Sequence, residues 1–209
     1  MQEKQRYTRI RKVILKLNHE RKKQAQQMDI LCNDIIAAQR DFIKKLERIS
    51  FIANFYSDIL GKKDLSGLCC AAGKLLTEQV PGAVIALIIC RGNDFEMHLF
   101  ENEGMNEQGG FQLEECLDNN LVNNISQSGK ICDIDDMVSM GLSCNPAKLN
   151  SICAKTIPLG RNGTDIGFIL IYRHSGNKLS EDEIQNIAAI TPGLSQAIQS
   201  NLTVLHPTD

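Results

Sequence analysis

The chain of 209 residues has room for one domain of about 150 residues and an extension. Its hydrophobic content of 43% suits a folded core, and no apolar run approaches the roughly 18 residues that cross a membrane. The N-terminus lacks the apolar block of a signal peptide, so we expect a cytoplasmic protein. The net charge of −2 conceals a basic segment, because residues 1–60 hold thirteen Lys or Arg against seven Asp or Glu.

The N-terminal segment carries apolar side chains at alternating steps of three and four residues. Sixteen positions follow this spacing from Tyr7 to Ile59, and only Arg21, Gln24 and Lys45 among them are polar. A lone helix cannot bury such a stripe, which predicts a coiled coil that pairs with a second copy of the chain. The thirteen apolar positions, called the seam below, are Tyr7, Ile10, Ile14, Leu17, Met28, Leu31, Ile35, Ala38, Phe42, Ile49, Ile52, Tyr56 and Ile59.

The basic charge of this segment is expected on the solvated surface of the coiled coil. A protein that reads nucleic acid would usually offer stacking aromatics, whereas Tyr7, Phe42 and Tyr56 lie on the seam. We therefore expect neither nucleic acid nor a membrane as partner. Pro and Gly are absent before Gly61, which favours one helix, and we assign the coiled coil to residues 1–61.

The following segment alternates between helix and strand patterns. Residues 65–79 have helical apolar spacing, and the Pro-Gly pair behind them ends that helix. Residues 83–91 and 95–100 are predicted strands on either side of a tight turn. We expect a helix over 113–128, closed by Gly129, and a short strand over 130–134.

The C-terminal part predicts a hairpin and a helix. Residues 135–150 are expected to be irregular, and 151–159 and 166–173 form two strands joined by a turn with an Asn-Gly pair. Ser180 and Glu183 form a capping box at the start of the last helix. Pro192-Gly193 is expected to kink or split that helix.

Eight cysteines are many for a cytoplasmic protein, yet no pair has the two-residue separation of a zinc or redox motif. We expect most of them to be buried free thiols, with no disulfide framework and no bound metal.

The hairpin and the helix start together resemble a known family. Ala154-Lys155-Thr156-Ile157-Pro158-Leu159, a turn and Ile166-Gly167-Phe168-Ile169-Leu170-Ile171 precede Ser180-Glu181-Asp182-Glu183. This order is similar to that of GAF domains, the small ligand-sensing fold of bacterial signalling proteins and phytochromes. The resemblance implies an α+β fold with a central antiparallel sheet and helices packed on one face. We assign it residues 62–203, followed by a tail at 204–209.

The resemblance also implies a ligand pocket on the other face of the sheet, covered by residues 110–150. No cofactor is expected, and the ligand stays unidentified. Bilin-binding members attach their chromophore through a Cys commonly followed by His, whereas Asn145 follows Cys144. The dispersed residue set of cyclic-nucleotide members has no convincing match in this sequence. The side chains expected to line the pocket are Phe111, Leu121, Ile134, Met137, Met140, Cys144 and Thr156.

Free methionine sulfoxide reductases offer a second comparison within the GAF family. They are GAF enzymes with an active-site Cys in the loop shortly before the hairpin, and Cys144 resembles that placement. Their chemistry needs a second Cys that resolves the sulfenic acid, for which Cys132 and Cys116 are the nearest candidates.

Three hypotheses result. The first is a non-enzymatic sensory or scaffold module that dimerises through the seam and passes a signal to a partner protein. The second is a thiol-based redox enzyme or sensor that uses Cys144. The third is a structural assembly component whose GAF pocket has lost its ligand.

Overall fold

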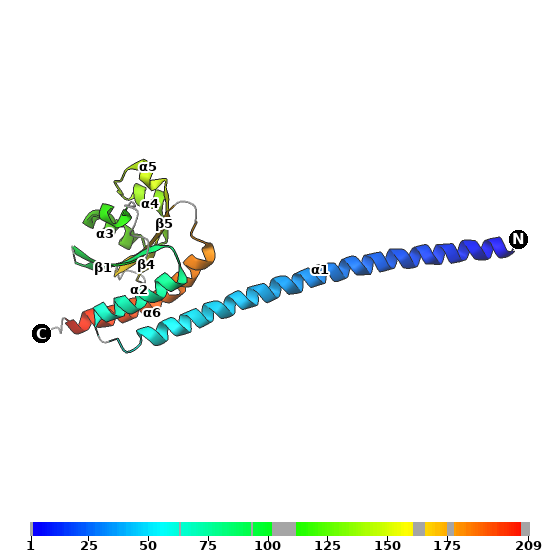
Figure 1. The fold of residues 1–209 in the computed structure, drawn as a ribbon, viewed down its shortest axis with the longest axis horizontal. Coiled ribbons are helices and arrows are strands. Elements are labelled where there is room, and N and C mark those ends of the chain that lie inside the picture. Colours follow the sequence, from blue (N-terminus) through cyan, green and yellow to red (C-terminus); the bar gives the residue numbers. More distant parts are fainter. Residues whose placement is uncertain are drawn as a thin grey trace. The chain divides into compact units, whose positions relative to one another are not determined.

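The computed structural model describes residues 2–62, 64–92, 94–101, 112–160, 166–174 and 178–205. The chain divides into two compact units, Met1–Ile49 and Ser50–Asp209, which we call the N-terminal helix unit and the domain. Each unit is described by itself. Figure 1 shows the elements in order along the chain.

The first helix, α1 (Gln2–Ile59), confirms the long helix expected from the sequence. It continues without interruption through the polar stretch around Arg21 and Gln24. The domain begins at Ser50, so the last ten residues of α1 belong to it. A boundary at residue 61 had been expected, and the packing described below explains the difference.

The domain is built on five antiparallel strands, as the GAF resemblance implies. They are β1 (Val84–Arg91), β2 (Asp94–Phe100), β3 (Cys132–Asp133), β4 (Ile152–Leu159) and β5 (Gly167–His174), in the spatial order β2-β1-β5-β4-β3. Val84 pairs with Tyr172, and Ile152 with His174. Gly167 is required where β5 meets β1, because its φ is +137° and a Cβ there would collide with the Ile88 carbonyl oxygen.

One face of the sheet is covered by helices α2 (Leu65–Gln79) and α6 (Glu181–Leu205) (Figure 1). Side chains alternate along β1, so Ile85, Leu87 and Ile89 point into this layer. The end of α1 joins the same core, which we call the helix-side cluster: Phe55 is 0% exposed and Ile59 is 5% exposed. Burial of these two side chains places the start of the domain inside α1.

The ends of α2 and α6 follow the sequence signals. Asp64 accepts a hydrogen bond from the Gly67 amide at the start of α2, and the capping box of Ser180 and Glu183 is present at α6. The expected split at Pro192 is wrong, since α6 runs unbroken. Pro192 leaves the carbonyl of residue 188 without its helical donor, and the Thr191 hydroxyl bonds to it instead.

In the described part of the chain, the other face of the sheet is covered by short helices: η2 (Leu113–Cys116), α3 (Asn119–Ser128), α4 (Ile134–Ser139) and α5 (Pro146–Leu149). The single helix expected over 113–128 is therefore wrong, because Asp118 starts a new helix by accepting from the Leu121 amide. Residues 135–150, expected to be irregular, hold α4 and α5. The sequence does carry the signal for α4, a reciprocal capping box of Asp133 and Asp136.

Candidate functional site

The seam of the N-terminal helix unit is uncovered within one chain. Nine of its large side chains, from Tyr7 to Ile49, are between 51% and 77% exposed. Six further apolar side chains of α1 between Val13 and Leu46 are 46–61% exposed beside them. Such a long apolar band is typical of a surface that another helix covers.

The last three seam residues have a different environment. Ile59 is buried in the helix-side cluster, and Ile52 and Tyr56 are half-buried against it. Ile59 is therefore not available to a partner chain, whereas the place of Ile52 and Tyr56 in a dimer interface stays a prediction. The ring of Tyr56 lies so close to Gly193 of α6 that a Cβ there would collide with it. The exposed seam ends at Ile49.

A ligand pocket was expected on the face of the sheet covered by η2, α3, α4 and α5, which we call the lid helices. This face holds a second apolar core, which we call the lid-side cluster. Leu121 is 1% exposed, and Met137 and Thr156 are 0% exposed, so no water-sized space touches Met137 or Thr156. Ile134, Met140 and Cys144 are half-buried and pack against this cluster. Phe111 lies outside the described residues. The structure thus brings five of the six described candidates to one apolar cluster, where they pack together, and buries Thr156 on β4.

Two surface hollows are present elsewhere in the domain. One, of about 730 Å³, lies between the end of α1 and α6 and is lined among others by Tyr56, Pro192 and Gln199. The other, of about 430 Å³, lies beside β4 and includes Ile134 and Lys155. Of the predicted pocket residues, only Ile134 lines either of these two hollows.

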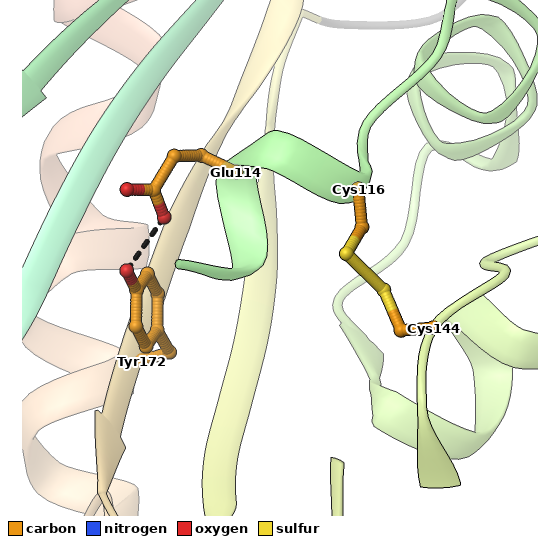
Figure 2. Close-up of a disulfide and its surroundings, with 4 residues drawn as sticks. All are labelled: Glu114, Cys116, Cys144 and Tyr172. Carbon is orange, nitrogen blue, oxygen red and sulfur yellow. Dashed lines mark hydrogen bonds between the residues drawn. A yellow bond between two sulfur atoms is a disulfide. The ribbon is translucent and has the colours of Figure 1, made fainter. Parts of the chain in front are cut away.

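A disulfide joins Cys116, the last residue of η2, to Cys144, which precedes α5 (Figure 2). The two residues are 28 positions apart, and their Cα atoms are separated by 6.3 Å. Both are half-buried at the edge of the lid-side cluster. No disulfide had been expected from the spacing, because the bond depends on how η2 and the residue 140–145 segment meet in space.

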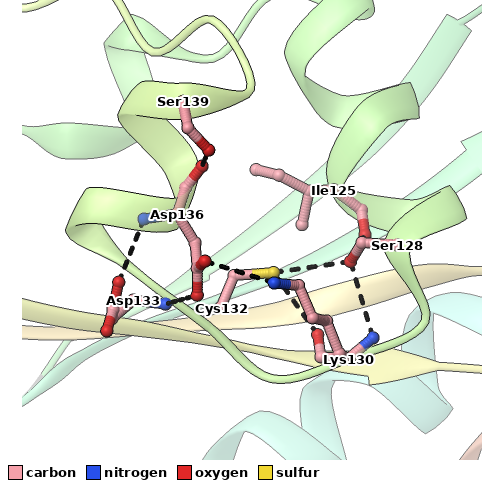
Figure 3. A network of polar contacts seen from close by, with 7 residues as sticks. All are labelled: Ile125, Ser128, Lys130, Cys132, Asp133, Asp136 and Ser139. Carbon is pink, nitrogen blue, oxygen red and sulfur yellow. Dashed lines mark hydrogen bonds and ion pairs between the residues drawn. The ribbon is translucent and has the colours of Figure 1, made fainter.

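Cys116 was one of two candidates to resolve a reaction at Cys144, and the structure pairs it with Cys144. The other candidate, Cys132, is buried on β3 with its sulfur 3.4 Å from the Ser128 hydroxyl (Figure 3). Nearby, Lys130 pairs with Asp136 at 3.2 Å. The hydrogen bond and charge of each partner raise the pKa of Lys130 and lower that of Asp136. Cys132 itself is buried in the lid-side cluster and is part of the packing under α3 and α4.

Sequence reasoning missed a buried polar pair beside the disulfide. The Tyr172 hydroxyl donates to Oε2 of Glu114 at 2.5 Å (Figure 2). Glu114 is 6% exposed, and its other oxygen has no hydrogen-bond partner within the described ranges. Burial, followed by the bond to Glu114, raises the pKa of Tyr172 above its usual value. A Tyr in a buried strand needs a partner for its hydroxyl, which is the one sequence signal for this pair.

The remaining cysteines are not joined in disulfides. Cys69 is buried, which raises its pKa to about 12, whereas Cys32 and Cys70 are exposed and Cys90 and Cys153 are half-buried. Across the described ranges, no three His, Cys, Asp or Glu side chains are arranged to hold a metal ion. No helix in the described part of the chain is long and apolar enough to cross a membrane.

No family model matches the sequence, and no curated protein matches it. Solved structures do match. The GAF domain of a phosphoenolpyruvate-protein phosphotransferase from Coxiella burnetii is 13% identical, with a TM-score of 0.55 over 76% of this chain and 96% of that one. The corresponding Acinetobacter domain is 12% identical, with the same coverage and TM-score.

A third match is the chromophore-binding domain of an unusual bacteriophytochrome from R. palustris. It is 13% identical, with a TM-score of 0.54 over 78% of this chain and 63% of that one. These structural similarities establish the fold of the domain, which agrees with the hairpin and helix start in the sequence. The domain of this protein has the GAF fold, with a long helix at its N-terminal end.

Proposed function

We propose that this protein is a cytoplasmic sensory or scaffold module that dimerises through the exposed seam of α1 and passes a signal to a partner protein. The observation that carries the proposal is the contrast along α1. Its side chains from Tyr7 to Ile49 are exposed, whereas Phe55 and Ile59 are buried in a GAF core. One helix thus carries both an uncovered apolar band and a segment of the domain core.

The exposed seam supports pairing with a second copy. Apolar residues at a and d positions bury themselves when two such helices wrap around each other. A seam that meets an identical seam satisfies this requirement without any further partner. The polar positions Arg21, Gln24 and Lys45 would weaken the coiled coil locally, which suits a helix that changes its packing during signalling.

Sedimentation equilibrium of the full chain at micromolar concentration tests the dimer. We expect the wild type to sediment as a dimer and Ile35→Glu, which places a charge on the seam, as a monomer. The matched control is Asn33→Glu, which introduces the same residue two positions away and off the seam, and it should remain dimeric. A monomeric wild type, or a dimeric Ile35→Glu variant, would contradict the proposal.

The sensory part is tested by thermal shift of the full chain with cyclic nucleotides and small metabolites. A ligand that binds only the native state raises the melting temperature. If none of these compounds shifts it while the protein is dimeric, the scaffold version of the proposal holds and the sensory version fails.

A thiol-based redox function is the second candidate. The disulfide between Cys144 and Cys116 favours it, because a sulfoxide reductase needs a second Cys that can bond to its active-site Cys. Turnover of free methionine sulfoxide with dithiothreitol, lost in Cys144→Ser and kept in Cys153→Ser, would support the reductase. No turnover by the wild type would exclude it.

A further inference from the structure

We propose that Cys116 and Cys144 form a reversible thiol–disulfide site that controls access to the lid-side cluster. When the pair is oxidised, η2 is held to the residue 140–145 segment, and the cluster is closed. When the pair is reduced, the two segments separate and the cluster admits small apolar molecules. The inference extends the proposed sensory function by naming a redox input, and it does not depend on dimerisation.

The short helix η2 is held differently at its two ends. This helix has four residues and no side-chain cap at its start. Leu113 is fully buried, and Glu114 is bonded to Tyr172, so the N-terminal half of η2 is anchored to the sheet (Figure 2). The C-terminal half ends at Cys116, where the disulfide is the covalent anchor. Beyond Cys116, half-buried Leu117 packs against the lid-side cluster and α3 follows, so reduction loosens the C-terminal end of η2 while its N-terminal half stays bonded to Tyr172.

The other end of the disulfide lies in the segment between α4 and α5. Between α4 and α5, Leu142 is the one residue whose side chain is buried. The Asn124 amide donates to the Met140 carbonyl at 2.9 Å, and the Leu142 amide donates to the Met137 carbonyl at 2.9 Å. Half-buried Met140 and Cys144 also pack against the lid-side cluster, so the segment is held by local hydrogen bonds and by the edge of this cluster. A segment held in this way opens at a lower free energy once a covalent tie is removed.

The other cysteines differ from this pair in burial and in bonding. Cys69 and Cys132 are buried within the two clusters, where a reductant or oxidant cannot reach them. Cys116 and Cys144 are half-buried residues at the edge of the lid-side cluster. Exposed Cys32 and Cys70 remain free. One disulfide among free, exposed thiols is typical of a redox-sensing bond in a reducing compartment, where structural disulfides are rare.

The chemistry is ordinary thiol exchange. Hydrogen peroxide oxidises one thiolate of the pair to a sulfenic acid and leaves as hydroxide. The second thiol attacks that sulfur, the S–S bond forms and water leaves. In reverse, a thiolate of a dithiol such as dithiothreitol attacks one sulfur of the disulfide, which forms a mixed disulfide and releases one cysteine thiolate. The second thiol of the dithiol, as its thiolate, attacks the mixed disulfide and releases the other cysteine. Two electrons pass to the pair, the dithiol becomes a cyclic disulfide, and both cysteines end as thiols.

The test uses the full-length wild type, treated with hydrogen peroxide or with dithiothreitol. Differential alkylation and mass spectrometry identify which cysteines become reactive after reduction, and we expect Cys116 and Cys144. In the same samples, amide hydrogen exchange of residues 113–117 and 140–145 should accelerate roughly tenfold on reduction, with β1 and β5 unchanged. Fluorescence of the apolar dye ANS should rise on reduction and fall again on reoxidation.

Variants separate gating from general loosening of the fold. Cys144→Ser should bind ANS under both conditions, and Cys153→Ser, a half-buried free thiol on the other side of β4, should behave as the wild type. Alkylation of both Cys116 and Cys144 after peroxide treatment would overturn the inference, as would exchange and ANS binding that reduction leaves unchanged. Because the wild type itself is switched, the test stands even if a variant fails to fold.

The same samples are sedimented. If reduction changes neither hydrogen exchange nor ANS binding while the protein is dimeric in both redox states, the redox site is refuted and the proposed dimer stands. If the protein is monomeric and reduction still changes both readouts, the proposed dimer is refuted and the redox site stands.

Discussion

Replacement of Phe55 by alanine tests whether the domain core extends into α1. Phe55 is 0% exposed and contacts two aromatic neighbours, Phe51 and Tyr56, with ring centroids 6.1 Å and 6.0 Å away. The matched control is Phe42→Ala, the same substitution thirteen residues earlier in the same helix, where the side chain is 62% exposed. The two variants have the same change in composition and helix propensity.

The magnitude follows from burial. Truncation of a fully buried Phe costs about 3–5 kcal/mol through lost transfer free energy and the cavity left behind. Alanine returns about 0.5 kcal/mol of helix propensity. We therefore expect Phe55→Ala to lower the free energy of unfolding of the domain by about 3–4 kcal/mol. Phe42→Ala should change the unfolding free energy of the domain by less than about 0.5 kcal/mol, because Phe42 lies outside the domain. Its lost seam contact would weaken dimerisation instead, which appears as a dependence on protein concentration.

Urea denaturation followed by near-ultraviolet signals of tyrosine is the assay. The chain has no Trp and three Tyr, of which Tyr56 and Tyr172 lie in the domain. Far-ultraviolet circular dichroism would be dominated by the 58 residues of α1. Two protein concentrations separate association from folding, since a dimer contribution depends on concentration. A loss below about 1 kcal/mol for Phe55→Ala, or equal losses for both variants, would refute the assignment of α1 to the core.

Three further predictions concern pH and packing. Burial, then the bond to Glu114, raises the pKa of Tyr172, and burial raises that of Cys69 to about 12. Both groups have a lower pKa in the unfolded chain than in the folded chain. The unfolding free energy should therefore be highest below about pH 9 and fall above it, by about 1 kcal/mol per group and pH unit. In urea titrations from pH 8 to 11, Cys69→Ala should flatten this fall, and a flat wild-type profile would contradict it. Burial acts to raise the pKa of Glu183, but its hydrogen bonds outweigh burial and lower it. Its contribution is therefore present above about pH 4.5 and lost below, and Glu183→Gln should remove this acid dependence. Gly193→Ala should lower the unfolding free energy by about 1–3 kcal/mol, because a Cβ there meets the ring of Tyr56; an increase, as in an exposed helix, would show that the contact is loose.

Much of the domain was predictable because its signals are local. The Pro-Gly pair behind Gln79, the turn after Arg91 and the capping box at Ser180 each act within a few residues. The region between residues 112 and 150 was harder. Its helices have ten residues or fewer, and their periodicity is too short to separate η2 from α3 or to reveal α4. The cap at Asp118 was visible in the sequence but ambiguous, since an Asp can also lie within a helix.

The features of the candidate site likewise divide into those with a local sequence signal and those without one. The apolar stripe of α1 follows from spacing alone, although its change of environment after Ile49 does not. The family pattern places Leu121 and Met137 on the face of the sheet opposite α2 and α6, where both are buried. The disulfide and the Glu114–Tyr172 bond could not be predicted, because they join residues 28 and 58 positions apart. No local rule relates such residues, and their approach depends on how the lid helices pack on the sheet.

The sequence by itself determined that α1 is one long helix with an apolar stripe, since helix propensity and heptad spacing are properties of neighbouring residues. Only the tertiary structure decided where that stripe changes its role. Ile49 and Ile59 occupy the same kind of seam position, yet one is 61% exposed and the other 5% exposed. The difference arises because α2, α6 and the sheet surround the end of the helix, and burial depends on neighbours that are distant in the chain.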